Sequence, residues 1–158
     1  MKKTEKTNVM RILEQNKVAY ESHSYAATEA ISGTEVAAVL NQNPEQVFKT
    51  LVTEGKTGQH YVFVVPVSRE LDLKKAAGVV GEKSVAMIKM KELLPLTGYI
   101  HGGCSPIGMK KQFPTVFDRS ADSFDTIIFS AGKIGYQVQL SLQDLAKILP
   151  YQLADLCE

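Results

Sequence analysis

Residues 101–108, HGGCSPIG, bring three glycines, a proline, a histidine and a cysteine together in one short stretch. A thiol three residues after an imidazole is the composition of a nucleophile with its general base, here Cys104 and His101. Such a nucleophile needs a lowered pKa and a base in contact with the sulfur, which a Gly-Gly turn does not ensure. We therefore favour the interpretation in which Cys104 is a small side chain without a chemical role.

The glycines of the same stretch indicate a different chemistry. Gly102, Gly103 and Gly108 can adopt backbone angles that other residues avoid, and without Cβ atoms they let a ligand approach the main chain. N–H groups exposed in such a loop bind an oxyanion or the carbonyl oxygen of a substrate. A tight turn shaped by the glycines and Pro106 accounts for the same residues, and the sequence leaves both interpretations open.

Lys49 is a second candidate for chemistry. In VFKTLV, side chains alternate between faces, so Lys49 shares a face with Val47 and Leu51. A lysine on an apolar strand face extends to water, pairs with an acid or serves a pocket. Its structural alternative is an edge-strand lysine that discourages aggregation. Ser130, at the end of DTIIFS, is likewise either a site hydroxyl or a cap.

Patterns that would bind a metal ion or a nucleotide cofactor are absent from the sequence. The three histidines lie far apart, and neither HExxH nor CxxC occurs. The glycine-rich stretches 101–108 and 130–135 match neither GxxxxGK[ST] nor GxGxxG. We therefore predict an activity that uses no metal and no cofactor.

The composition is that of a globular protein with a single domain, residues 1–158. It is 44% hydrophobic and 22% charged, and no apolar run approaches the roughly 18 residues that span a membrane. The basic N-terminus has no signal-peptide core, and two cysteines do not make a disulfide framework, so we expect a cytoplasmic protein without a membrane partner. A net charge of +1 excludes a strongly basic nucleic-acid binder but allows a local patch, for which the candidates are the lysine clusters Lys74–Lys75, Lys89–Lys91 and Lys110–Lys111, although such clusters are usually solvated faces.

Helices and strands are predicted to alternate irregularly. Capping patterns are Ser32 with Glu35, Asp72, and Ser141 with Asp144. Hydrophobic periodicity predicts helices over 8–16, 34–40, 72–80, 89–95 (stopped by Pro95) and 142–149, and strands over 18–25, 47–54, 61–68, 84–88, 114–120, 125–132 and 136–140. Adjacent strand pairs without strict alternation indicate an α/β fold with a mixed sheet and helices outside it.

Five stretches together resemble the YbaK/EbsC family, which includes aminoacyl-tRNA trans-editing deacylases and the editing domain of bacterial prolyl-tRNA synthetases. They are HSY at residue 23, NPEQVFKTLV, ELDLKKAAG, TGYIHGGCSPIG, and SAGKIG with its QDLAKIL helix. Their order and separation carry the resemblance over roughly residues 8–150. It implies a curled, partly barrel-like mixed β-sheet with surrounding helices, and no metal.

The resemblance also implies an activity, the hydrolytic release of cysteine from mischarged Cys-tRNA(Pro), and from Cys-tRNA(Cys) as a second substrate. In this family the lysine at position 49 is the key pocket residue. Gly102, Gly103 and Ser130 correspond to positions that act with it. The thiol that attacks is thought to belong to the substrate, which leaves as a thiolactone, so that Cys104 would be incidental. Recruitment through prolyl-tRNA synthetase would replace a large basic surface with effective concentration.

Substrate-binding positions implied by the resemblance are Tyr20, Ser32, Gly132 and Gln137, and two of these depart from the family pattern. Ser32 stands where one branch has an aromatic residue, and Gln137 where several members have an aspartate. Because one methylene is worth only about 1–3 kcal/mol in a pocket, these departures bear on amino-acid specificity. The alternatives are therefore a deacylase for another small residue, such as Ala-tRNA(Pro), a non-catalytic tRNA- or synthetase-binding module, and a thiol hydrolase that uses Cys104.

Overall fold

The computed structural model of the chain describes residues 6–26, 28, 30 and 32–158. Its helices are α1 (Asn8–Gln15), α2 (Gly33–Val39), α3 (Leu73–Val80), α4 (Met90–Thr97), α5 (Leu142–Leu145) and a 3₁₀ helix (Arg119–Ser123). Its strands are β1 (Glu21–Ser24), β2 (Phe48–Gly55), β3 (His60–Pro66), β4 (Val85–Met87), β5 (Thr115–Asp118), β6 (Ile127–Ser130), β7 (Tyr136–Leu140) and β8 (Gln152–Ala154).

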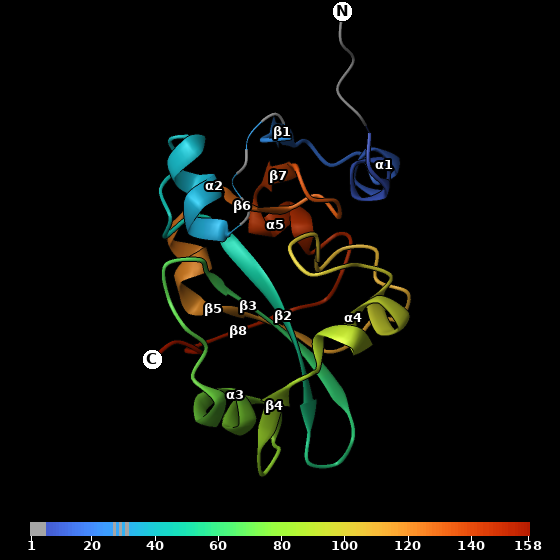
Figure 1. Ribbon diagram of the computed structural model, residues 1–158, viewed down its shortest axis with the longest axis vertical. Coiled ribbons are helices and arrows are strands. Elements are labelled where there is room, and N and C mark those ends of the chain that lie inside the picture. Colours follow the sequence, from blue (N-terminus) through green and yellow to red (C-terminus); the bar gives the residue numbers. More distant parts are fainter. Residues whose placement is uncertain (1–5, 27, 29, 31) are drawn as a thin grey trace, which may run out of the picture.

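The strands form two sheets, and the predicted mixed α/β class is confirmed. A three-stranded antiparallel sheet has the order β1-β7-β6, and a five-stranded sheet has the order β4-β2-β3-β5-β8 (Figure 1). The larger sheet is mixed, because β2 runs antiparallel to β3 and β4 whereas β3, β5 and β8 are parallel. Within the described residues the sheets do not close into a barrel, so the barrel-like part of the expectation is replaced by two separate sheets.

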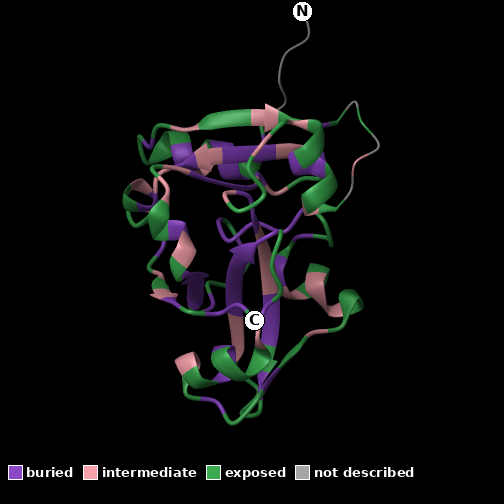
Figure 2. Cartoon of the chain, turned by 90° about the vertical axis from the view of Figure 1, so that its left-hand side faces the viewer, coloured by how far each residue is buried: buried purple, intermediate pink, exposed green. Residues whose placement is uncertain are grey.

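Two hydrophobic cores lie on the two faces of β3. Val62 and Val64 belong to a core shared with α1 and the smaller sheet, and Phe63 and Val65 belong to a second core that contains residues of α3. Figure 2 shows these central strands buried while the helices keep exposed outer faces. The apolar run of β3 is therefore explained by burial on both sides.

The predicted caps fix the starts of three helices, and at α5 Ser141 Oγ accepts from the Asp144 N–H at 3.1 Å. Ser32 Oγ accepts from Glu35 N–H, and Glu35 returns the bond to the Ser32 N–H, which confirms the capping box of α2. Asp72 accepts from the N–H groups of Lys74 and Lys75 at the start of α3. These short bonds satisfy N–H groups that lack partners within their helix.

Three predicted boundaries are wrong. Pro95 lies inside α4, which ends at Thr97 because Gly98 adopts a left-handed conformation (φ 87°) and donates to the Leu94 carbonyl. The helix predicted over 142–149 is regular only to Leu145, and β1 is shorter than the predicted 18–25. β8 was not predicted, because its parallel pairing with β5 is a long-range contact that leaves no local pattern.

No helix in the described part of the chain is long and apolar enough to cross a membrane.

Candidate functional site

The site is built around a change in the pairing of β2. β3 covers β2 over its whole length, whereas β4 pairs only with Thr53–Gly55. The last bond on that edge runs from the Ile88 N–H to the Val52 carbonyl at 3.3 Å, after which the chain turns into α4. Because peptide groups alternate between the two edges of a strand, Thr50 presents its N–H and C=O to the same, now open, edge.

A cleft of about 650 Å³ occupies this opening. It is walled by α2, the first half of β2, the β4–α4 segment, the loop at residues 101–104, and the paired ends of β6 and β7. Five of the predicted residues line it: Ser32, Lys49, Gly102, Ser130 and Gln137. Tyr20, Gly103 and Gly132 are not among the lining residues. Clefts of 300–1,000 Å³ are the usual size of small-molecule sites.

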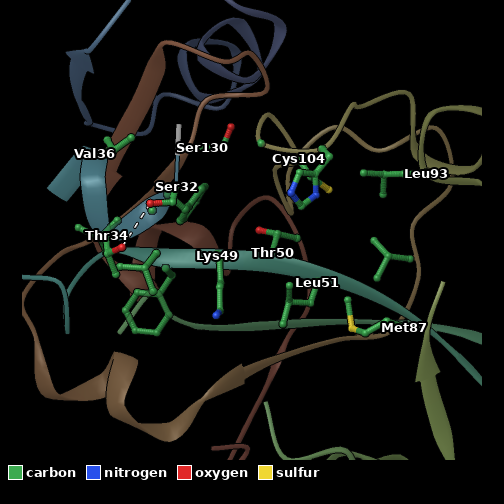
Figure 3. A pocket seen from close by; sticks show the side chains of 18 of the residues that line it. Ser32, Thr34, Val36, Lys49, Thr50, Leu51, Met87, Leu93, Cys104 and Ser130 are labelled. Atoms are coloured by element: carbon green, nitrogen blue, oxygen red, sulfur yellow. Dashed lines mark hydrogen bonds between the residues drawn. The ribbon is translucent and has the colours of Figure 1, made fainter. Parts of the chain in front are cut away.

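Lys49 reaches the cleft from one side of β2. Figure 3 shows Lys49 and Thr50 extending from opposite sides of the strand, with Thr50 toward Cys104 and Lys49 pointing away from it. Lys49 Nζ lies 3.6 Å from Glu70 Oε1, whose side chain is 77% exposed. An ion pair this open is weak, so the lysine is free to exchange its partner for a substrate group.

The loop at residues 101–108 presents its main chain through Gly102. Gly102 is exposed, has φ 88° and lines the cleft, and its N–H has no main-chain partner among the described residues. The Gly103 N–H instead donates to the Ile100 carbonyl at 3.0 Å, and a Cβ there would lie 3.2 Å from Ile134 N. Gly102 is therefore a lining residue whose N–H has no main-chain partner among the described residues, and Gly103 shapes the turn.

Tyr99 explains why the two glycine-containing loops lie so close together. Its hydroxyl donates to the Ile107 carbonyl, and its side chain packs against both loops. A Cβ on Gly108 would lie 2.9 Å from Tyr99 Oη, and one on Gly132 would lie 3.0 Å from Tyr99 Cε1. Gly132 (φ 92°) therefore has a packing role in this structure.

Ser130 and Gln137 face one another across the β6–β7 ladder. Ser130 Oγ accepts from the Gly132 N–H at 3.1 Å, so its proton remains for another acceptor. Gln137 is buried, and its Oε1 accepts from Gln42 Nε2 at 2.8 Å, which fixes the amide against the cleft wall. Together they form the polar end of the cleft.

Two further predicted residues differ in their surroundings. Ser32, the N-cap of α2, is exposed at the cleft wall, with Oγ 3.3 Å from Thr34 Oγ1. Tyr20 donates to Glu14 Oε2 at 2.6 Å, and burial together with this acidic partner raises the pKa of Tyr20 to about 12. Its hydroxyl is thus engaged with α1.

The surroundings of Cys104 oppose a nucleophilic role. The residue lines the cleft but is only 9% exposed, and burial raises the pKa of its thiol to about 12. A reactive cysteine requires the opposite shift, toward the thiolate. The structure therefore supports the interpretation in which Cys104 is a packing residue.

Sequence reasoning did not single out several lining residues as part of a site. They include Thr34, Thr50, Glu70, Met87, Met90 and Leu93. Thr50 Oγ1 is buried without a hydrogen-bond partner within the described residues. The sequence signal for this part of the site was MIKMK at residues 87–91, where apolar and basic side chains adjoin at the start of a helix. The first turn of a helix has no preceding turn to pack against, so an apolar side chain there can stay uncovered.

Metal ligands do not converge in the described part of the chain, where no group of three His, Cys, Asp or Glu side chains could hold an ion.

Comparison with known proteins identifies the family. The model of the aminoacyl-tRNA editing domain matches residues 28–148. A protein of Enterococcus faecalis (strain ATCC 700802 / V583), named “Putative Cys-tRNA(Pro)/Cys-tRNA(Cys) deacylase EbsC”, is 46% identical over 157 residues, which are 98% of this chain and 96% of that protein.

Solved structures share the fold over nearly the whole chain. A crystal structure described as “a putative trans-editing enzyme for prolyl tRNA synthetase” is 25% identical, with a TM-score of 0.80 over 96% of this chain and 98% of that one. The crystal structure of hypothetical protein APE2540, at 22% identity, has a TM-score of 0.86 over 95% of this chain and 99% of its own. The chain therefore belongs to the aminoacyl-tRNA editing domain family, in the YbaK/EbsC group that its motifs resemble.

Proposed function

We propose that this protein is a trans-editing deacylase that removes cysteine from mischarged Cys-tRNA(Pro), with Cys-tRNA(Cys) as a second substrate. The observation that carries the proposal is a single cleft of about 650 Å³ shared by Lys49, Gly102 and Ser130, in a chain 46% identical to a protein with that name. Such a volume fits an amino acid esterified to a terminal nucleoside.

The reaction uses the sulfur of the substrate. The cysteinyl thiol loses its proton, and the sulfur attacks the ester carbonyl carbon to give a tetrahedral oxyanion. The bond from this carbon to the ribose oxygen then breaks, the ribose oxygen takes a proton, and cysteine leaves as a thiolactone that water opens. No protein nucleophile is required, in keeping with the raised pKa of the Cys104 thiol.

The protein's task is then to orient the ester and to stabilise charge on its carbonyl oxygen. Gly102 and Ser130 supply the donors at the lining of the cleft, and the Lys49 ammonium, which Figure 3 shows pointing away from Ser130 and Cys104, supplies a cation. In our proposal Gly102 and Ser130 bind the oxyanion. Lys49 leaves Glu70 to hold the reacting ester, and Gly103 sets the angle of the loop.

Specificity rests on the cleft walls. The hydroxyls of Ser32 and Thr34 and the amide of Gln137 make the cleft walls polar, and at position 32 one branch of the resembled family has an aromatic residue instead. A polar wall of this kind also admits alanine, so Ala-tRNA(Pro) remains the second candidate substrate. A thiol-dependent mechanism predicts fast release of cysteine and slow release of alanine, because alanine has no internal nucleophile.

Recruitment and location follow from the same proposal. With a net charge of +1 the protein has little general attraction for RNA, so we propose that prolyl-tRNA synthetase delivers the tRNA. We propose that residues 1–158 act as a single editing domain in the cytoplasm, without a membrane partner or a cofactor.

The test is release of labelled cysteine from Cys-tRNA(Pro) by the wild type and by Lys49→Ala. We expect kcat/KM to fall about 100-fold, the size of effect typical when one electrostatic group is lost from a reacting centre. Lys147→Ala is the matched control, because Lys147 is also ion-paired, to Asp144 at 3.1 Å, but lies outside the cleft. Equal rates for wild type and Lys49→Ala would remove Lys49 from the mechanism, and binding without turnover by wild type would favour the non-catalytic module.

A further inference from the structure

A ridge between β4 and α4 separates two hollows in the surface. We call residues 87–91 the ridge. On one side lies the cleft, and on the other a second hollow of about 380 Å³ bordered by Glu54–Lys56, Ser84 and Glu92. Met87, Ile88 and Lys89 line both hollows, so a chain that leaves the cleft over these residues enters the second hollow directly.

The ridge exposes apolar surface that folding leaves uncovered. Met90 is 69% exposed and Met87 47%, and Figure 3 shows Met87 at the edge of the cleft. Exposed apolar side chains gathered beside a cleft are typical of a binding surface. Flexible, polarizable thioethers pack well on flat rings.

The ridge also carries positive charge without internal compensation. Lys89 and Lys91 are exposed, and neither lies within 4.0 Å of an acidic oxygen of the described residues. The acid in the same turn, Glu92, accepts from the Lys89 main-chain N–H at 3.2 Å. This carboxylate caps the helix start and leaves both ammonium groups available to an anionic partner.

We propose that the ridge binds the unpaired 3′ end of the aminoacylated RNA. The inference rests on the proposed function, which places the terminal nucleoside and its ester in the cleft. The preceding nucleotide then crosses the ridge into the second hollow, with a base face against Met87 or Met90 and its phosphate beside Lys89 or Lys91. Sites for single-stranded nucleic acid combine cations with side chains, usually aromatic, that pack on the bases, and on the ridge the thioethers of Met87 and Met90 would take the place of the aromatic rings.

The test compares two cysteine esters, full-length Cys-tRNA(Pro) and cysteinyl-adenosine, which lacks every nucleotide that would cross the ridge. For Met90→Ser we expect kcat/KM on the tRNA to fall about 2- to 10-fold more than on cysteinyl-adenosine, the size expected when one contact between a thioether and a base ring is lost. For the double variant Lys89→Gln with Lys91→Gln, we expect the slope of log kcat/KM against log salt to flatten by about 0.7, the value for one phosphate contact on a single strand.

A matched control lies on α3. Leu73 is 41% exposed and the adjacent Lys74 is exposed without an ion pair among the described residues, but neither lines either hollow. The double variant Leu73→Ser with Lys74→Gln should keep the wild-type ratio between the two substrates. Equal losses on tRNA and cysteinyl-adenosine in the ridge variants would overturn the inference.

A binding measurement separates this inference from the proposed function. A fluorescent single-stranded RNA that ends in CCA and carries no amino acid is titrated with each variant. Weaker binding by the ridge variants than by the α3 control would support the ridge even if no cysteine were released, whereas identical binding would overturn it. Absence of release by wild type from both esters would instead overturn the deacylase.

Discussion

The two halves of β2 have the same neighbour on one edge and opposite surroundings on the other. From Thr53 to Gly55 the strand is sealed between β3 and β4, and from Phe48 to Val52 it borders the cleft. In the sealed half the buried Thr53 hydroxyl donates to the Tyr61 carbonyl at 3.1 Å, whereas the Thr50 hydroxyl is buried without a partner in the described structure.

The hairpin of β2 and β3 acquires a site because β4, the strand on the other edge of β2, ends early. The register that pairs β4 with β2 would carry on to place Met90 opposite Thr50, but the helix α4 begins at that residue. As a result, the main-chain N–H and C=O of Thr50 form no bonds to β4 and border an opening instead. Sites of this kind hold groups that do not serve stability. Substitutions in the sealed half of β2 should therefore lower the free energy of unfolding, whereas removal of an unpaired polar group in the half that borders the cleft should raise it.

The largest effect on stability is expected in the sealed half, for Gly55→Ala. A Cβ at this position would lie 2.3 Å from Glu82 Cδ, and the Glu82 carboxylate is held by the hydroxyls of Thr57 and Tyr61. Moving the carboxylate breaks these bonds, so we expect a loss of about 1–3 kcal/mol in the free energy of unfolding, measured by urea denaturation. Unchanged stability would show that Glu82 can move freely.

Thr53→Val should have a smaller effect of the same sign. Valine keeps the volume of threonine but cannot donate to the Tyr61 carbonyl, so we expect a loss of about 1 kcal/mol in the free energy of unfolding. The rate of cysteine release per folded molecule should stay at the wild-type value. A gain in stability would contradict the assignment of this hydroxyl.

Thr50→Val should act in the opposite direction. Because the Thr50 hydroxyl is buried without a hydrogen-bond partner among the described residues, replacing it with a methyl group should raise the free energy of unfolding by up to about 1 kcal/mol. Thr50→Ser keeps the hydroxyl and serves as the control. If Thr50→Val and Thr53→Val shift the urea midpoint in the same direction, the contrast between the halves is lost.

The smallest effect is expected for Cys104→Ser, on the wall that faces the open half. Because the thiol has a pKa of about 12, it stays protonated at neutral pH and contributes no step to the pH dependence of the rate there. The rate should instead rise with pH as the substrate thiol ionises, near pH 8.5, in both wild type and variant. Loss of this rise with pH in Cys104→Ser would instead support the hypothesis that Cys104 is the nucleophile.

Local patterns predicted most of the fold. The capping box at Ser32 and Glu35, the cap at Asp72 and the hairpin of β2 and β3 depend on residues close together in sequence, and all are confirmed. The separation into two sheets and the strand β8 depend on pairings between distant segments, for which the sequence of each strand carries no information. The prediction that α4 ends at Pro95 was wrong because the helix continues through Pro95 and ends at Gly98.

The site was predicted less completely than the fold. Lys49, Gly102 and Ser130 were named from residue type and resemblance, and they meet at one cleft. Lys49 points away from Cys104 because successive side chains of a strand lie on opposite faces and Thr50 is on the face toward Cys104, an assignment of faces that depends on tertiary packing. The contribution of Met87 and Met90 could not be predicted, because their exposure results from where β4 stops.

The last residues of the chain hold the partner of Lys49 in place. The Glu158 N–H donates to the Glu70 carbonyl at 3.1 Å, and the Asp72 N–H donates to the Leu156 carbonyl at 2.7 Å. During synthesis Lys49 and Glu70 leave the ribosome long before residues 156–158 do. The acidic side of the cleft is therefore in place only after residues 156–158 have been made and have docked, which ties the Lys49–Glu70 pair to a segment far along the chain.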